Sequence, residues 1–341
     1  MASVYPWQSA LWQSLQDLRG RLPHALLIKG AQGIGKREIA AEFARSLLCE
    51  QRGPDGTACG ACPSCHWLAQ ESHPDFRLIQ PEAMSASDES GSEDESKKSK
   101  QISVDQIRSL VHFSNLTAHQ GGLKVILIHP AEAMNLNAAN ALLKTLEEPP
   151  LGVLFILVSH KPQQLLPTIR SRCLALSAVP PTKEESVFWL ESQGVKQPES
   201  WLARAGFAPV AAQALAESGG EGKEYAALLQ SLSRPDQLDA IAVAEHLQRA
   251  EPAKVILLLQ QWTYDLIDIH LARQVRYFAE QTAQLGRLAQ QADLYQLLQF
   301  QRELNEARRV AGHPLNPRLV FETLLYSYQK VFFRATRHAV H

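Results

Sequence analysis

The feature that most constrains the fold lies at residues 30–37, which read Gly-Ala-Gln-Gly-Ile-Gly-Lys-Arg. This segment follows an apolar run at Ala25–Lys29 and opens a stretch of helical periodicity at Arg37–Leu48. A glycine-rich loop between a strand and a helix is typical of phosphate-binding loops, whose backbone N–H groups surround phosphates while a lysine reaches them. The residues that match this pattern are Gly30, Gly33, Gly35 and Lys36. The chain is therefore predicted to carry a phosphate-type site at one edge of an α/β sheet.

The loop departs from the pattern at its last position. An intact loop carries a Ser or Thr hydroxyl that holds Mg²⁺, but Arg37 stands here, and a guanidinium cannot ligate a cation. Such ATPases also carry an acidic pair after a second strand, where this chain has His129 and Pro130. Glu132, shortly after, is interpreted as a solvated or helix-capping carboxylate. We predict that this chain does not hydrolyse ATP. Binding of nucleotide without hydrolysis stays open, with Arg37 partly replacing Mg²⁺ or filling the pocket.

Apolar, β-branched-rich runs separated by helical segments predict a parallel sheet that is buried on both faces. These runs are Ala25–Lys29, Phe76–Gln80, Lys124–His129, Val153–Ser159 and Cys173–Ala178. A helix is predicted at Asn137–Glu148 because the apolar periodicity stops there at two prolines. The first domain is expected to span residues 1–180.

After Pro180 and Pro181 the patterns predict helices only. Short helices at Lys183–Gln193 and Pro209–Ser218 indicate a small helical domain over residues 181–220. Longer helices follow over 221–341, and the last is expected to begin after Pro317.

A cysteine cluster follows the first predicted helix. Cys49, Cys59, Cys62 and Cys65 have the spacing C-x9-C-x2-C-x2-C, which suits a closed tetrahedral zinc site. The alternative is a set of free or redox-active thiols. With four cysteines satisfying the metal, His66 and His73 are expected to be ordinary surface residues. Cys173 stands apart, with no metal role.

Bulk properties exclude several classes of protein. The formal net charge of −1 argues against a strongly electrostatic nucleic-acid binder. No apolar run reaches the length of a membrane span, and the N-terminus lacks a signal-peptide pattern, so a cytoplasmic protein is expected. Residues 85–100 contain no large apolar side chain and are predicted to be a disordered surface insertion.

Arg170 and Arg172 flank Ser171 shortly after the fourth apolar run. An arginine held rigidly at a strand edge can stabilise a phosphoryl group bound by a neighbouring subunit. From spacing alone, a solvated loop pair is the stronger interpretation.

Several motifs together resemble one family. They are the run at 137–150 with its Leu-Leu-Lys-Thr-Leu-Glu-Glu-Pro-Pro ending, the segment Ile-Arg-Ser-Arg-Cys at 169–173, the four-cysteine insertion and the segment at 314–325. The chain resembles the clamp-loader branch of the AAA+ ATPases, of the bacterial DNA polymerase III type. The resemblance covers essentially the whole chain.

The resemblance implies an AAA+-like domain with a zinc module, a small helical lid and a helical collar that holds a ring-like assembly together. Motor subunits of this family carry the hydroxyl and the acidic pair that Arg37, His129 and Pro130 replace here. This chain is therefore expected to be the non-hydrolysing subunit beside the gamma/tau motor subunits and the delta subunit. Sliding clamp and primed DNA are expected as partners through the complex, and Arg172 matches the position of the family's arginine finger, which acts in trans.

Two other classes of function remain as alternatives. One is an active clamp-loader ATPase that uses Glu132 in an unusual geometry. The other is a zinc-dependent DNA-binding protein, which the near-neutral charge disfavours.

Overall fold

The structure is a computed structural model that describes residues 4–84, 99–118, 122–218, 223–311 and 316–332. Most of the predicted disordered insertion at 85–100 lies outside these residues. The chain divides into two compact units, Met1–Glu185 and Ser186–His341. The predicted further boundary near residue 220 stays a prediction.

The first unit contains a five-stranded sheet with the order β2-β3-β4-β1-β5, in which every pair is parallel. Each strand coincides with a predicted apolar run to within a residue at either end. The strands are β1 (Ala25–Lys29), β2 (Phe76–Ile79), β3 (Lys124–Ile128), β4 (Val153–Ser159) and β5 (Leu174–Ser177). The expected α/β fold with a parallel sheet is confirmed.

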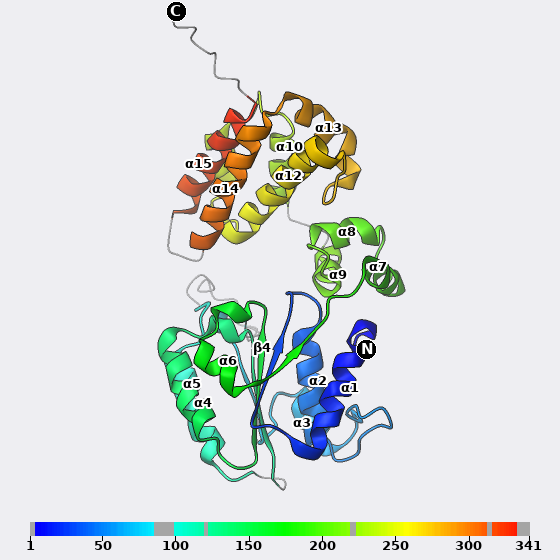
Figure 1. The fold of residues 1–341 in the computed structure, drawn as a ribbon, viewed down its shortest axis with the longest axis vertical. Coiled ribbons are helices and arrows are strands. Elements are labelled where there is room, and N and C mark those ends of the chain that lie inside the picture. Colours follow the sequence, from blue (N-terminus) through cyan, green and yellow to red (C-terminus); the bar gives the residue numbers. More distant parts are fainter. Residues whose placement is uncertain (1–3, 85–98, 119–121, 219–222, 312–315, 333–341) are drawn as a thin grey trace, which may run out of the picture. The chain divides into compact units, whose positions relative to one another are not determined.

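Helices cover both faces of this sheet (Figure 1). On one face lie α1 (Ser9–Asp17), α2 (Lys36–Leu48) and α3 (Pro63–Ala69), and on the other α4 (Val104–Asn115), α5 (Leu136–Glu147) and α6 (Pro167–Arg172). Successive strand residues enter the two cores in turn: Leu26 packs in the first core and Leu27 in the second. Because both faces are buried, the strands read as continuous apolar runs.

The second unit is helical throughout its described residues. Its elements are α7 (Lys183–Ser192, which begins at the unit boundary), α8 (Pro198–Arg204), α9 (Pro209–Glu217), α10 (Lys223–Leu232), α11 (Ala240–His246), α12 (Pro252–Ala272), α13 (Thr282–Gln291), α14 (Leu294–Val310) and α15 (Pro317–Lys330). One apolar cluster joins α10 through α15. At its centre Trp262 Nε1 donates to the Tyr328 hydroxyl at 2.9 Å, and this hydroxyl donates to the Leu232 carbonyl at 2.7 Å. Among the described helices, none combines the length and apolar character that crossing a membrane requires.

Candidate functional site

The predicted phosphate-binding loop connects β1 to α2, as the sequence pattern requires. Gly30 packs so closely on the fifth strand's exit that a Cβ there would lie 2.6 Å from the Ala178 carbonyl oxygen. A Cβ on Gly35, whose φ is +85°, would lie 2.3 Å from the Tyr5 ring. Both positions therefore need glycine.

An N-terminal segment that sequence reasoning missed packs on this loop. Trp7 Nε1 and Gln8 Nε2 both donate to the Ile34 carbonyl, at 3.0 Å and 2.9 Å. The Tyr5 ring stacks on the Trp7 ring with centroids 4.9 Å apart. These contacts hold the loop through its Ile34 carbonyl and not through its N–H groups. The spacing of the aromatic residues in the sequence does not predict them.

The loop lysine is buried and faces its own loop. Lys36 is only 2% exposed, and its ammonium donates to the Ala31 carbonyl. Burial lowers the pKa of Lys36 to about 8, although the nearby carboxylates of Glu132 and Glu38 oppose this shift.

His129, one of the two residues that stand where an acidic pair was expected, lies against a second histidine, His160. His129 follows β3 and His160 follows β4, and their Nε2 atoms lie 3.1 Å apart. Burial, then His160, Arg37 and Lys36, lower the pKa of His129 to about 3. Burial and Lys36 lower that of His160 to about 4. Both rings are therefore neutral at pH 7.

The carboxylate of Glu132 is already engaged next to this pair. Its Oε1 accepts the backbone N–H groups of His160 and Lys161, at 2.9 Å and 3.2 Å. It therefore holds the loop after β4, a role that differs from the expected solvated or helix-capping one. Within the described part of the chain, several buried polar atoms here lack a hydrogen-bond partner: Oε2 of Glu132, Oγ of Ser159, and Nδ1 of both His129 and His160.

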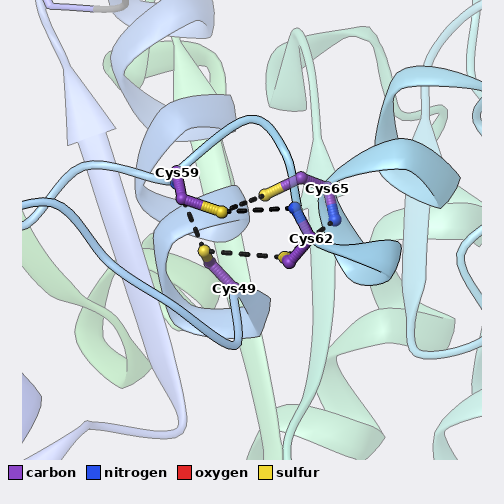
Figure 2. Close-up of side chains that lie close together, drawn as sticks. All are labelled: Cys49, Cys59, Cys62 and Cys65. Atoms are coloured by element: carbon purple, nitrogen blue, oxygen red, sulfur yellow. Dashed lines mark hydrogen bonds between the residues drawn. The ribbon is translucent and has the colours of Figure 1, made fainter.

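The four cysteines converge at the end of α2 and the start of α3 (Figure 2). The Sγ atoms of Cys49 and Cys62 lie 3.9 Å apart, as do those of Cys59 and Cys65. All four ligand atoms lie within 4.8 Å of one another. Burial disfavours the thiolate of Cys62, but backbone N–H donors, Cys65 first, outweigh it and lower its pKa to about 6.

His73 does not lie on the surface, so that expectation was wrong. It is 1% exposed, and its Nε2 lies 2.7 Å from the hydroxyl of Ser64. Ser64 in turn donates to the Leu48 carbonyl at 2.7 Å. The chain between α3 and β2 turns His73 inward, where its contact with Ser64 holds α3 against α2. The distance of His73 from the cysteines along the sequence did not indicate this contact. His66 is exposed as expected.

Arg172 ends α6 and is held in place. Its Nη2 lies 2.6 Å from Oε1 of Glu147, the last residue of α5, and its Nη1 donates to the Thr168 carbonyl at 3.1 Å. The side chain of Arg172 remains 34% exposed. Arg170 is exposed, and no ion pair joins it to any described residue. The structure thus distinguishes two arginines that spacing alone could not.

The parallel sheet, the loop between β1 and α2 and the helical second unit define an AAA+-like fold. Residues 7–181 match the family model described as "DNA polymerase III, delta subunit". The DNA polymerase III subunit delta' of Pseudomonas aeruginosa is 37% identical over 347 residues, which cover 96% of this chain and 98% of that protein. The chain belongs to the family of DNA polymerase III delta' subunits.

Two further relatives are also DNA polymerase III subunits. The delta' subunit of Escherichia coli is 35% identical over 202 residues, covering 58% of this chain and 56% of that protein. The DNA polymerase III subunit tau of Salmonella typhimurium is 37% identical over 155 residues, covering 46% of this chain and 21% of that protein. The similarity to tau is confined to less than half of this chain.

Proposed function

We propose that this chain works as the delta' subunit of a bacterial clamp loader, in the cytoplasm. It assembles with gamma/tau motor subunits and a delta subunit, and the complex loads the sliding clamp onto primed DNA. The observation that carries this proposal is the relationship to the delta' subunit of Pseudomonas aeruginosa, which extends over nearly the full length of both chains. The chain is then a component of the polymerase holoenzyme and not an enzyme by itself.

Reconstitution tests this function. The gamma/tau and delta subunits from the same genome, with and without this chain, are assayed for ATP turnover and for clamp loading on primed DNA. Loading should require the chain. Full loading without it would refute the proposal, and salt-sensitive DNA binding by the isolated chain would favour the zinc-dependent DNA-binding alternative.

We propose that the phosphate-binding loop of this chain does not hydrolyse nucleotide. Arg37 supplies no oxygen for Mg²⁺, and the neutral pair of His129 and His160 supplies no negative charge. One oxygen of Glu132 is already bonded to backbone N–H groups. The isolated chain should show no turnover with primed DNA. Turnover that disappears in Glu132→Gln would support the active-ATPase alternative instead.

We propose that the cysteine cluster holds a structural zinc ion. Four sulfurs placed about 2.3 Å from one zinc in a tetrahedron lie about 3.8 Å apart, close to the 3.9 Å of Cys49–Cys62 and Cys59–Cys65. The backbone N–H of Cys59 donates to the sulfur of Cys49 at 3.3 Å, and that of Cys65 donates to the sulfur of Cys62 at 3.4 Å, as suits thiolate ligands. With four protein ligands no coordination position is open for catalysis, so the ion would tie segment 49–65 to α2.

We propose that Arg172 is an arginine finger that acts on ATP bound by an adjoining motor subunit. It is exposed enough to reach a neighbour, and it occupies the matching position of the Ser-Arg-Cys motif. Arginine fingers contribute about 10³–10⁵ to the rate of phosphoryl transfer.

Substitution of this arginine is a direct test. Arg172→Ala should leave the chain folded and assembled but lower the DNA-stimulated ATPase of the reconstituted complex by about 10²-fold or more. Arg170→Ala, two residues away and equally charged, is the matched control and should keep wild-type turnover. Equal turnover for Arg172→Ala and wild type would refute the finger assignment.

A further inference from the structure

The ion pair between Glu147 and Arg172 is unusual in its placement. Glu147 is the last residue of α5, and a carboxylate at a helix C-terminus is repelled by the helix dipole. The guanidinium of Arg172, which lies 2.6 Å away, offsets that repulsion. Because α5 and α6 pack against each other, the two helix ends hold this pair at a fixed place.

The pair leaves part of the guanidinium available. Arg172 Nη2 donates a hydrogen bond to Glu147, and its Nη1 donates one to the Thr168 carbonyl. A guanidinium has five N–H donors in one plane, and no described residue accepts the others. These two acceptors therefore set the orientation of the guanidinium plane. Its remaining N–H groups stay open to a ligand from outside the chain.

We propose that Glu147 is a positioning residue that orients Arg172 toward the phosphates of a nucleotide in an adjoining subunit. This inference rests on the arginine finger of the proposed function. A long side chain without this anchor would sample many rotamers, and misplacement by about 1 Å can cost about 10²-fold in rate. Glu147 itself touches no reacting atom.

The test uses the reconstituted complex and measures DNA-stimulated ATPase against ATP concentration. Glu147→Ala should lower kcat by roughly tenfold, since part of the orientation is lost, and should leave KM within about twofold because the motor subunits bind ATP. Glu147→Gln retains an acceptor oxygen and should fall between Glu147→Ala and wild type. Glu148→Ala, the adjacent exposed carboxylate, is the matched control and should equal wild type.

A double-mutant cycle separates positioning from a general structural effect. If Glu147 acts only through Arg172, the Glu147→Ala/Arg172→Ala double variant should be no slower than Arg172→Ala. Losses that multiply, or wild-type kcat for both Glu147 variants, would overturn the inference.

Gel filtration identifies an alanine variant that fails to assemble, and Glu147→Gln is then the variant that is compared with wild type. If Arg172→Ala itself keeps wild-type turnover, the proposal that Arg172 is an arginine finger is refuted. If Arg172→Ala is slow but Glu147→Ala is unaffected, only the positioning role of Glu147 is refuted.

Discussion

At the scale of single residues, Asp265 shows how one buried carboxylate organises its surroundings. It lies in α12 with no exposed surface. Its oxygens accept the backbone N–H groups of Arg276, Tyr277 and Phe278 at distances from 2.8 to 3.2 Å. Burial raises the pKa of Asp265, and these N–H donors oppose the rise. The loop between α12 and α13 is thus held by a side chain more than ten residues away in sequence.

Removing this carboxylate should destabilise the second unit. Asp265→Ala leaves several N–H groups without an acceptor, and we expect a loss of about 3 kcal/mol in the free energy of unfolding. Asp265→Asn, which keeps one acceptor oxygen, should lose less. Urea unfolding measures both, with Asp268→Ala in the same helix as a control expected within about 0.5 kcal/mol of wild type. Equal stability for Asp265→Ala and Asp268→Ala would contradict this account.

At the scale of elements, the strands were predictable and their order was not. Leu26 and Leu27 face opposite cores and are both buried, so sequence alone shows a continuous apolar run. The order β2-β3-β4-β1-β5 depends on how the connecting helices pack, and no local pattern carries that information. For the same reason His129 could be singled out as a defect in sequence, whereas its partner His160 emerged only when β3 and β4 paired.

The histidine pair predicts a pH dependence of stability. The pKa values of about 3 for His129 and about 4 for His160 lie below the ordinary value of 6.5. Between the ordinary pKa and these lower values, the two histidines bind protons in the unfolded chain but not in the folded chain. The free energy of unfolding that is present above pH 6.5 therefore decreases as the pH falls. The slope should reach about 1.4 kcal/mol per pH unit for each such proton.

Denaturant unfolding at pH 7.5, 6 and 5 measures this slope. His160→Asn should flatten it, because one depressed group is removed and His129 no longer faces a second imidazole. His24→Asn, at an exposed histidine in the same unit, should keep the wild-type slope. An unchanged slope in His160→Asn would mean that other groups cause the acid sensitivity.

At the scale of the whole molecule, two units with separate cores predict two unfolding transitions. The cysteine cluster belongs to the first unit, and structural zinc contributes directly to folding free energy. Removing the metal with a chelator should therefore lower the first melting temperature and leave the second unchanged. Calorimetry with and without chelator measures this, and Cys62→Ser should reproduce the chelated profile without chelator. If chelation moves neither transition, the proposed zinc ion has no structural role.

The sequence by itself determined the α/β class of the first unit, its strands, the altered loop and the membership in a clamp-loader family. The strands and the loop depend on residues that are close along the chain, where periodicity and spacing act directly, and the family resemblance depends on a set of such local motifs taken together. Only the tertiary structure decided that His73 is buried, that His129 meets His160, and that Glu147 holds Arg172 while Arg170 stays unpaired among the described residues. These contacts join side chains from separate elements, and their formation depends on packing, which no local sequence pattern specifies.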